Sequence, residues 1–443
     1  MNETGAEIGV AIVGCGTVGG AVGVMLTRDQ ALLAERSGVR VKLRALVDKD
    51  FTNARRLGLS ESLFRTDLAP VLADPGVHVV VELVGGTTFA GEVIKQALKA
   101  GKDVVTANKA LLAHRGPELS ALARANGVSL GFEASCGGGI PIIRALTDGL
   151  LANRIDALYG IVNGTCNYIL SQMTANGRTY AEALAEAQRD GLAEADPTLD
   201  VAGTDSAHKL TILAGLAFGR RVNFDAIDVA GIDALDVRDI RYGQELGYVV
   251  KLLAIARRQG DGLVLRVGPA FISRNHPLAW VSGPFNAVSV YGHATGHTMH
   301  YGRGAGGAPT GSAVVADILS AALGDSRRRF ASLRLWADVS PEARQLPIDA
   351  ATGRHYIRLC AADQPGVLAQ IATILGEHGI SICSVLQQEV PGSDKGSGVP
   401  VIITTHEAQE GQMRAALAKV DRLDSVKAPT VCIDIVDEHP EQP

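Results

Sequence analysis

Four carboxylates and one lysine fall within sixteen positions near the middle of the chain. Asp205 and Lys209 are four residues apart, so on a helix they share one face and can form an ion pair. Carboxylates in such a group can bind the ammonium group of an amino acid or orient a lysine that moves a proton. The segment therefore predicts either an acid–base site or a solvated helix face with salt bridges. Its charged residues are Glu194, Asp196, Asp200, Asp205 and Lys209.

Two further polar segments stand where predicted strands end. Lys109 closes the sequence TANK after a predicted strand at 103–106, and ligands of parallel sheets bind outside the carboxyl ends of the strands. The sequence NGTCNY at 163–168 offers backbone N–H groups that could hold a carboxylate, and a simple capped helix start explains it equally well. Two lysines at one site would make proton transfer near neutral pH easier.

The sequence GCGTVG follows the first apolar run and precedes a helical pattern, which is the context of a dinucleotide-binding loop. Its glycines allow a tight turn, close approach of a pyrophosphate and close packing of helix on strand. Asp48 ends the second predicted strand and would accept hydrogen bonds from a ribose diol, which favours NAD. Lys49 could contact a 2′-phosphate, which favours NADP, so the choice stays open. The loop residues are Gly14, Cys15, Gly16, Thr17, Val18 and Gly19.

Strand and helix patterns alternate over the first third of the chain, which predicts an α/β fold with a Rossmann-type, doubly wound parallel sheet. From about residue 144 longer helices appear, and a second, α+β domain is expected. A helix at 311–323 should pack back onto the first domain. The expected strands are 8–13, 41–47, 77–84, 103–106, 128–132, 264–267 and 287–291. The expected helices are 91–100, 117–125, 179–190 and 204–217. The helix 179–190 starts with a capping box, and Gly191 follows it as its C-terminal cap.

The last eighty residues predict a small ferredoxin-like unit of the order βαββαβ. Its strands are expected at 355–361, 381–389, 400–405 and 431–436, and its helices at 367–378 and 407–420. The predicted domains are thus a nucleotide-binding domain at 1–143, a substrate-binding and dimerisation domain at 144–310, a linker at 324–354 and the C-terminal unit at 355–437.

Composition excludes several classes of protein. With 443 residues, 47% of them hydrophobic and 20% charged, the chain can bury the cores of two to four domains and is not disordered. A net charge of −5 without a basic patch argues against a nucleic-acid partner. Apolar runs are too short to cross a membrane. Six scattered cysteines without a CxxC pair are typical of a reducing compartment, so we expect a cytoplasmic protein.

Taken together, the motifs resemble the homoserine dehydrogenase family over nearly the whole chain. The segments that carry the resemblance are VELVGG at 81–86, GKDVVTANK at 101–109, EAS at 133–135, GGGIP at 137–141, the turn at 163–168, the block at 191–209, and GRGAGG with the following PT at 302–310. The resemblance implies that L-aspartate 4-semialdehyde and L-homoserine are interconverted with NAD(P)H, a step in threonine, methionine and isoleucine biosynthesis.

The resemblance also implies roles for individual residues. Lys209 would donate the proton, and Lys109 would lie beside the reacting oxygen and the nicotinamide. Glu194 and Asp205 would bind the substrate's amino group, and Asp200 would support Lys209. Gly164 and Thr165 would form a turn that faces the substrate or cofactor. The implied cofactor contacts are the glycine-rich loop, Asp48, Lys49, Thr87, Lys109, Gly191 and Gly306.

Members of the family hold a monovalent cation, usually sodium, near the hinge. The implied ligands are the carboxylate or carbonyl of Glu133 and the carbonyls of Cys136, Gly138 and Ile140, and ligation by oxygen alone suits a hard cation. Cys136 replaces a residue that is commonly valine, which a backbone ligand should tolerate. Many NADP-using relatives carry an arginine near Asp48, and its absence here weakens the case for strict NADP preference.

The C-terminal unit resembles an ACT domain, a module that often binds an amino acid at a dimer interface. Threonine, the end product of the pathway, is the obvious effector, and a purely structural dimerisation module is the alternative. The expected effector residues are Asp363, Pro365, Gly366 and Val367. We expect a homodimer or homotetramer, because family members pair through the middle domain.

Three histidines stay without an assigned role. His293, His297 and His300 would have a metal-capable spacing on a helix, but Gly292 and Gly296 argue against a regular helix, and polar loop residues near the active cleft are the alternative. Two other functions remain open from the motifs: a dehydrogenase for another amino acid, which would not need the 191–209 block, and a non-catalytic amino-acid sensor, which would bind without turnover.

Overall fold

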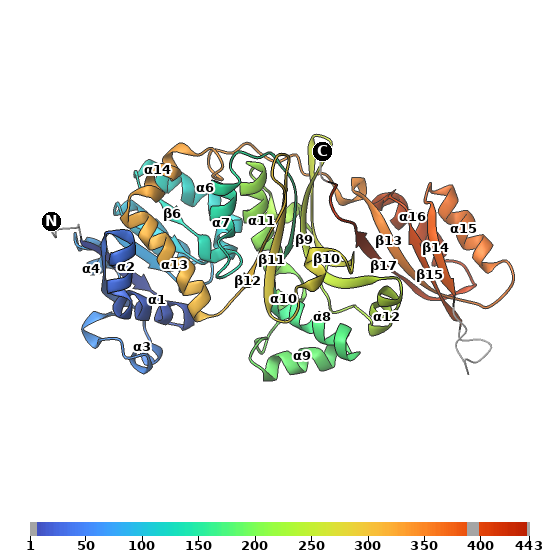
Figure 1. Ribbon diagram of the computed structural model, residues 1–443, viewed down its shortest axis with the longest axis horizontal. Helices are drawn as coiled ribbons and strands as arrows, with labels where there is room; N and C mark the ends of the chain where they lie inside the picture. Colours follow the sequence, from blue (N-terminus) through green and yellow to red (C-terminus); the bar gives the residue numbers. More distant parts are fainter. Residues whose placement is uncertain (1–6, 388–397, 441–443) are drawn as a thin grey trace. The chain divides into compact units, whose positions relative to one another are not determined.

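The computed structural model describes residues 7–387 and 398–440. The chain divides into two compact units, each assembled from three stretches of sequence (Figure 1). The first unit consists of residues 1–164, 205–224 and 285–343, and the second of residues 165–204, 225–284 and 344–443. No helix among the described residues is long and apolar enough to cross a membrane.

The first unit contains a six-stranded parallel sheet with the order β3-β2-β1-β4-β5-β6. The predicted Rossmann-type fold is confirmed. Strand β4 ends at Glu82, earlier than expected, because the Glu82 carboxylate accepts the backbone N–H groups of Val84 and Gly85 and turns the chain. The strands are β1 (Glu7–Val13), β2 (Arg40–Val47), β3 (Phe64–Arg65), β4 (Val79–Glu82), β5 (Asp103–Thr106) and β6 (Leu130–Gly131), the last shorter than the predicted 128–132.

Helices α1 and α13 pack closely against each other and share one apolar core with the sheet. Glycines let them approach: a Cβ at Gly307 would lie 3.0 Å from the Thr17 carbonyl oxygen, and one at Gly311 would lie 3.5 Å from the Ala21 Cβ. The late helix α13 thus packs on the first helix of the chain. The helices of this part are α1 (Thr17–Arg28), α2 (Gln30–Ser37), α3 (Thr52–Arg56), α4 (Ala69–Ala73), α5 (Phe89–Lys99), α6 (Lys109–Ala125), α13 (Gly307–Ala322) and α14 (Asp325–Ser332).

The predicted start of one helix is wrong. Helix α6 begins at Lys109 rather than at Pro117, because the Asn108 side chain caps it by accepting the Leu111 N–H (3.1 Å), and Pro117 lies inside the helix. Proline lacks only one N–H and fixes a helical φ, so a helix anchored elsewhere can contain it. The predicted linker 324–354 also contains helix α14, whose Phe330 is buried and stacks on Trp336.

The first unit also contains a small antiparallel sheet with the order β12-β11-β7. Strand β7 leads into the turn at 163–168, and α11 carries the Asp205–Lys209 pair. These elements are β7 (Ile155–Ile161), β11 (Phe285–Gly292), β12 (Gly296–Arg303), α7 (Ile142–Arg144) and α11 (Thr204–Phe218).

In the second unit, a helical hairpin precedes long strands. Helix α9 has the predicted capping box, in which Thr179 and Glu182 bond each other's backbone N–H, and Gly191 follows it with a positive φ of 71°. Strands β9 and β10 form a long antiparallel pair. The elements are α8 (Gly164–Asn176), α9 (Tyr180–Arg189), α10 (Thr198–Val201), β8 (Asp228–Val229), α12 (Val237–Glu245), β9 (Tyr248–Gln259) and β10 (Gly262–Ser273).

The C-terminal part of this unit has the predicted order βαββαβ. Its strands are arranged as β17-β13-β15-β14, and the two helices enclose an apolar core with the sheet. Strand β17 also pairs in parallel with β10, so its sheet continues into the preceding strands of the unit. Residues 388–389 of the predicted strand 381–389 lie outside the described residues. The elements are β13 (Thr352–Ala361), α15 (Val367–Glu377), β14 (Ile382–Gln387), β15 (Val399–Thr405), β16 (Ala408–Gln409), α16 (Glu410–Val420) and β17 (Val426–Val436).

Candidate functional site

Asp205 lies between two lysines that come from different parts of the chain. Its Oδ2 accepts a hydrogen bond from Lys209 Nζ at 2.6 Å, and its Oδ1 lies 3.1 Å from Lys109 Nζ. A third donor, the Asn163 Nδ2, reaches Oδ2 at 2.8 Å. The structure thus unites three motifs that the sequence keeps apart: the end of β5, the turn after β7, and helix α11.

The charge of this group is well defined. Burial alone would raise the pKa of Asp205, but the ammonium groups of Lys209 and Lys109 and the hydrogen bonds from Lys209 and Asn163 hold that pKa well below its usual range. Asp205 is therefore a carboxylate at neutral pH. One carboxylate between two ammonium groups leaves a net positive site, which suits an oxygen that gains negative charge.

The two lysines differ in accessibility. The Lys209 side chain is 11% exposed, and its Nζ also donates to the Val162 carbonyl oxygen at 2.6 Å. These bonds use two of its three N–H groups, and within the described part of the chain the third is left for a ligand. The Lys109 side chain is 39% exposed. Lys209 is thus held in a fixed direction, while Lys109 reaches the site from a more open position.

A chain of hydrogen bonds fixes the start of α6, where Lys109 stands. Thr106 Oγ1 donates to the buried Glu82 carboxylate at 2.7 Å and accepts the Asn108 N–H at 3.1 Å. The Asn108 Nδ2 donates to the Gly86 carbonyl at 2.6 Å. The ends of β4 and β5 therefore position Lys109, as expected for the carboxyl ends of parallel strands.

The remaining predicted substrate residues lie in or next to the second unit. Gly164 starts α8, and the Thr165 hydroxyl donates to the Leu192 carbonyl at 2.7 Å, so the turn after β7 contacts the turn that contains Gly191. Glu194 is exposed. Asp200 belongs to α10, where its carbonyl accepts the Cys166 thiol at 3.2 Å.

The glycine-rich loop joins β1 to α1 as predicted. Gly14 has a φ of 102°, which favours glycine, and a Cβ there would lie 2.7 Å from the Leu83 carbonyl. A Cβ on Gly19 would lie 1.9 Å from the Gly14 carbonyl oxygen, whereas one on Gly16 would meet nothing within 4 Å. Gly14 and Gly19 therefore shape the loop, and Gly16 leaves open space in front of the N-terminus of α1. This is the arrangement that admits a pyrophosphate.

The acidic residue at the end of β2 faces the loop. Asp48 Oδ2 accepts the Cys15 N–H at 2.5 Å, and Oδ1 accepts the Lys49 N–H at 2.7 Å. Its carboxylate thus already stabilises the loop backbone, while Lys49 is exposed. Burial, and secondarily Asp48, raise the pKa of the Cys15 thiol to about 12, so Cys15 is not a reactive thiolate. Thr87 is exposed beyond β4, and Gly306, with a φ of 113°, precedes α13.

The loop after β6 contains the predicted cation ligands. The Glu133 carboxylate accepts the N–H groups of Ile143 and Arg144 at 2.8 and 2.9 Å, so it caps α7. Gly138, with a φ of 58°, packs so tightly on the loop 302–307 that a Cβ would lie 2.6 Å from the Gly304 carbonyl oxygen. With the carboxylate engaged in capping, the backbone carbonyls of this loop are the oxygens that fit a hard monovalent cation.

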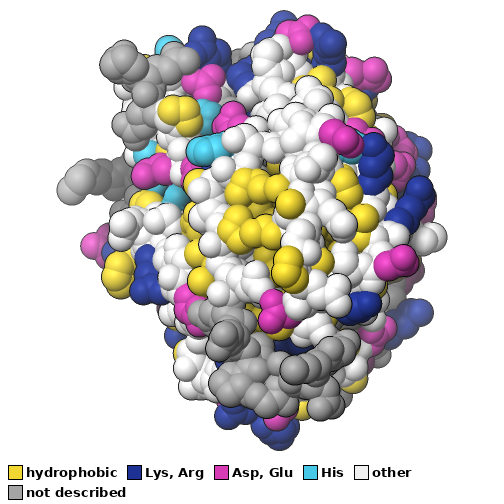
Figure 2. All heavy atoms as spheres, turned by 90° about the vertical axis from the view of Figure 1, so that its right-hand side faces the viewer, with side chains coloured by type: hydrophobic (Ala, Val, Ile, Leu, Met, Phe, Trp, Pro, Cys, Tyr) yellow, Lys and Arg dark blue, Asp and Glu magenta, His cyan; other side chains and the backbone are white. Residues whose placement is uncertain are grey.

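A cavity lies at the predicted effector site of the C-terminal unit. Its volume is about 270 Å³, and Asp363, Pro365 and Val367 line it together with Gln387. Gly366 stands at the start of α15 with a φ of 90°. The end of the molecule that carries α15 in Figure 1 faces the viewer in Figure 2, where hydrophobic side chains gather near the centre of the surface. Leu368 on α15 and Val385 on β14 are exposed large hydrophobic residues of this unit.

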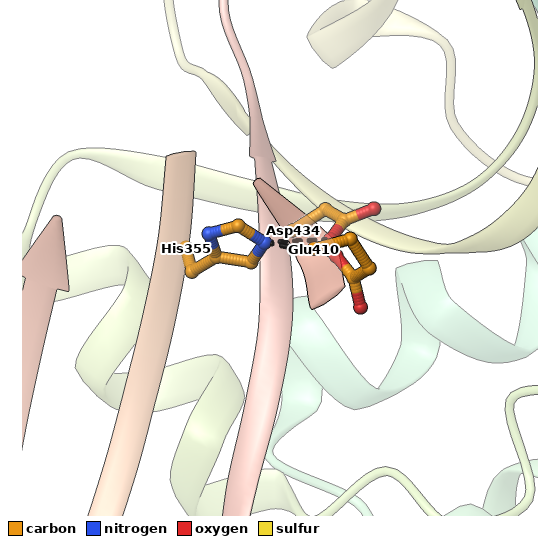
Figure 3. Close-up of side chains that lie close together, drawn as sticks. All are labelled: His355, Glu410 and Asp434. Atoms are coloured by element: carbon orange, nitrogen blue, oxygen red, sulfur yellow. Dashed lines mark hydrogen bonds and ion pairs between the residues drawn. The ribbon is translucent and has the colours of Figure 1, made fainter. Parts of the chain in front are cut away.

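The described residues contain one group spaced to hold a metal ion: His355, Glu410 and Asp434. His355 Nε2 lies 3.0 Å from a Glu410 oxygen, and the Asp434 carboxylate faces the same point (Figure 3). Arg266 forms ion pairs with both carboxylates. The guanidinium therefore supplies the positive charge that a metal would supply, and the group reads as a buried ion cluster between β10, β13, α16 and β17.

The histidines near residue 297 belong to the hairpin of β11 and β12, so the expectation of loop residues is wrong for His297 and His300, which lie on β12. His297 Nε2 lies 2.9 Å from Ser289 Oγ, and its ring stacks on Tyr291 at 4.5 Å. His293 Nδ1 accepts the Arg154 N–H at 3.0 Å. His293 and His297 thus both bond to other residues of the chain, and we assign no function to them.

Sequence reasoning missed three contributors to the site. Asn163 belongs to a motif that we singled out, but nothing in the sequence points its amide at Asp205. His208 stands beside Lys209, and its Nε2 lies 3.3 Å from the Nε2 of His114. The separation of 94 residues between these histidines leaves no local signal that could have paired them.

Comparisons with known proteins agree along the whole chain. Residues 14–133 match the family model "Homoserine dehydrogenase, NAD binding domain", residues 141–319 match "Homoserine dehydrogenase", and residues 355–422 match "ACT domain". A homoserine dehydrogenase of Pseudomonas aeruginosa is 44% identical over 96% of this chain and 98% of its own.

Solved structures give the same result. A homoserine dehydrogenase from Thiobacillus denitrificans has a TM-score of 0.91 and 42% identity, covering 98% of this chain and 99% of its own. A hyperthermophilic archaeal homoserine dehydrogenase in complex with NADPH has a TM-score of 0.60 and 28% identity, covering 72% of this chain and 98% of its own.

Proposed function

The chain belongs to the homoserine dehydrogenase family, and from that premise we propose that its reaction centre is the group of Lys209, Asp205 and Lys109. Members are NAD(P)-dependent oxidoreductases that act on a CH–OH group. The reaction of this chain is the reduction of L-aspartate 4-semialdehyde to L-homoserine and its reverse. The observation that carries the proposal is the bridging of both lysines by one buried carboxylate.

When bound, the reduced nicotinamide supplies the hydride for the aldehyde carbon. As the carbonyl oxygen gains negative charge, Lys209 Nζ donates a proton to it along the N–H that its bonds to Asp205 and Val162 leave over. Lys109 adds a second positive charge beside the same oxygen. Asp205 holds both ammonium groups in place, so the positive site exists before substrate arrives. In the oxidation of homoserine, Lys209 takes the proton back.

The acidic residues of the 191–209 block bind the other end of the substrate. We assign the substrate's amino group to Glu194 and Asp205 and a supporting role toward Lys209 to Asp200. Gly164 and Thr165 form the turn that faces substrate or cofactor. The bond from Thr165 to Leu192 supports this assignment, because it fixes Thr165 to the loop that contains Glu194.

The cofactor binds at the loop between β1 and α1, and NADP and NAD are both candidates. The NADPH complex of the archaeal relative supports NADP. The contacts of Asp48 with the loop backbone support it too, because this carboxylate is engaged by Cys15 and Lys49 N–H groups. Lys49 is then the group for a 2′-phosphate. Thr87, Lys109, Gly191 and Gly306 complete the proposed cofactor contacts.

The cofactor proposal is tested by initial-rate oxidation of L-homoserine with NAD⁺ and NADP⁺ supplied separately. We expect turnover with both and a kcat/KM at least about tenfold higher for NADP⁺, since one charge-assisted contact to a phosphate is worth 1.5–3 kcal/mol, roughly one to two powers of ten. In a Lys49→Ala variant the preference should shrink toward one, whereas the matched control Lys99→Ala, at the exposed end of α5, should keep it. A preference for NAD⁺ in the wild type would reverse the roles of Asp48 and Lys49.

We propose that a monovalent cation, sodium, binds to the carbonyl oxygens of Glu133, Cys136, Gly138 and Ile140. The engaged carboxylate of Glu133 and the tight glycine loop support ligation by the backbone. A backbone ligand explains why Cys136 can stand here, because burial raises the pKa of its thiol to about 12 and leaves it neutral. The cation would stiffen the loop that packs on residues 302–307.

The ACT domain binds an amino-acid effector, and we propose L-threonine in the cavity lined by Asp363, Pro365 and Val367, at the start of α15 behind Gly366. Its volume of about 270 Å³ suits a small amino acid. Asp363 would accept from the effector's ammonium group.

We expect L-threonine to change the initial rate of homoserine oxidation, and the Asp363→Ala variant to need at least about tenfold more threonine for the same change, the loss expected for one charged hydrogen bond. The matched control is Glu377→Ala, an exposed carboxylate at the end of α15 that does not line the cavity. Dose curves of rate against threonine make the measurement. An unaltered dose curve in Asp363→Ala would remove the effector from this cavity.

We also propose an oligomeric state, a cellular location and domain boundaries for the enzyme. The exposed hydrophobic residues Leu368 and Val385 support assembly of the chain as a homodimer or homotetramer. The six cysteines are thiols, which supports a reducing compartment, and we place the enzyme in the cytoplasm. The domain boundaries that we propose are 1–143 with the helix near 311–323, 144–310, the linker 324–354, and 355–437.

A further inference from the structure

Two imidazoles meet beside the reaction centre. The Nε2 atoms of His114 and His208 lie 3.3 Å apart, and both rings pack on Phe224, that of His208 in a stacked arrangement with its centroid 4.8 Å away and that of His114 edge-on at 4.6 Å. His208 is buried and His114 is exposed. The two histidines therefore form a contact between the helices α6 and α11 on the side next to Lys109 and Lys209.

The position of the pair is significant because α6 and α11 carry the reacting groups. His114 follows Lys109 by five residues on α6, and His208 stands on α11 between Asp205 and Lys209. The two helices are joined at the site by the ion pair of Lys109 with Asp205. The histidine pair is a second connection, about one turn further along α6.

His208 adds no charge to the site at neutral pH. Burial above all, together with the nearby His114, Lys109 and Lys209 and against the opposite effect of Asp205, lowers the pKa of His208 to about 4. A neutral imidazole offers one N–H and one lone pair, so one Nε2 can donate to the other. The charged and titratable groups that face His208 are His114 and Lys109 on α6 and Asp205 and Lys209 on its own helix.

We propose that His114 and His208 are positioning residues that hold the start of α6 against α11 and thereby set the approach of Lys109 to Asp205 and to the reacting oxygen. The proposal rests on the proposed roles of Lys109 and Lys209. The Asn108 cap fixes the backbone at the start of α6, but the Lys109 side chain is 39% exposed, so its approach also depends on how α6 lies against α11. A displacement of about 1 Å of such a group can cost about a hundredfold in rate.

A double-mutant cycle tests the proposal. We compare His114→Leu, His208→Leu and the double variant with the wild type, and His208→Gln as the conservative variant that keeps a donor and an acceptor. We expect each single leucine variant to lower kcat about tenfold, with KM for L-homoserine and the Kd of the nucleotide within about twofold of the wild type. The double variant should lose the same factor, because the two residues act as one unit, and His208→Gln should recover most of kcat.

A purely structural pair would lower Tm and leave kcat of the folded enzyme unchanged. The proposal is overturned if both single variants keep the wild-type kcat, or if the loss in the double variant is the product of the single losses. His406→Leu, an exposed histidine of the ACT domain, is the matched control. If His208→Leu does not fold, His114→Leu still decides, because His114 is exposed.

Lys209→Met, assayed in parallel, separates the two proposals. If Lys209→Met turns over like the wild type, the proposed reaction centre fails whatever the histidine variants do. If Lys209→Met is inactive while the histidine variants keep full kcat, only the positioning role fails.

Discussion

Replacing Lys209 with methionine is expected to lower kcat for homoserine oxidation by about 10²–10⁴, the usual contribution of a positioned acid–base group. The physical reason is that Lys209 Nζ is a buried donor aimed by both a carboxylate and a carbonyl, at 2.6 Å each. Methionine has a similar length and no proton to move. Nucleotide affinity should stay within about twofold, because the glycine-rich loop is untouched.

Lys209→Arg separates charge from proton transfer. Arginine keeps the positive charge beside Asp205 but cannot give up its proton at neutral pH. If Lys209 acts as the acid and base, this variant should be nearly as slow as Lys209→Met; if it acts only through its charge, activity should largely return. The matched control is Lys99→Met at the exposed end of α5, which should behave as the wild type. Steady-state rates and a thermal melt for each variant make the comparison.

Gly19→Ala is expected to destabilise the first unit, whereas Gly16→Ala is expected to spare the fold and weaken cofactor binding. A methyl group on Gly19 would lie 1.9 Å from the Gly14 carbonyl oxygen, a backbone atom that cannot rotate away. Overpacking of this kind costs about 1–3 kcal/mol or more, so Tm should fall by several degrees and nucleotide binding with it.

Gly16 is the matched control within the same loop. A methyl group there meets nothing within 4 Å, so Tm of Gly16→Ala should equal that of the wild type. The space is the one that the pyrophosphate should fill, so the Kd of the nucleotide should rise at least about tenfold, as for the loss of one good polar contact. Thermal melts and nucleotide titrations decide. Unchanged nucleotide affinity in Gly16→Ala would place the pyrophosphate elsewhere.

Local patterns in the sequence predicted much of the molecule because local interactions set these features. The glycines at 14 and 19 are required by short-range steric contacts, the capping box of Thr179 and Glu182 spans one helical turn, and the pair Asp205–Lys209 needs only helical spacing. The order of strand and helix patterns predicts the ferredoxin-like C-terminal unit, and the structure reproduces that order.

The features that sequence reasoning missed depend on tertiary packing. Lys109 meets Asp205 only because β5 and α11 come together, and the donor Asn163 joins them from the turn after β7. The motif predicts that Asp48 faces a ribose, and the bond that its carboxylate accepts from the Cys15 N–H depends on the approach of the loop after β1 to the end of β2. The sequence pattern predicts a helix start at Pro117, and the Asn108 cap that starts α6 earlier is visible only in the fold.

The most direct test of the central claim is a single-turnover experiment on wild-type enzyme and Lys209→Met. Enzyme loaded with the reduced nucleotide is mixed rapidly with L-aspartate 4-semialdehyde, and the absorbance of the reduced nicotinamide is followed. We predict one fast turnover in the wild type and, in a Lys209→Met protein that binds the nucleotide equally well, a phase slower by about 10²–10⁴. An equally fast phase in the variant would contradict the claim that Lys209, held by Asp205, donates the proton.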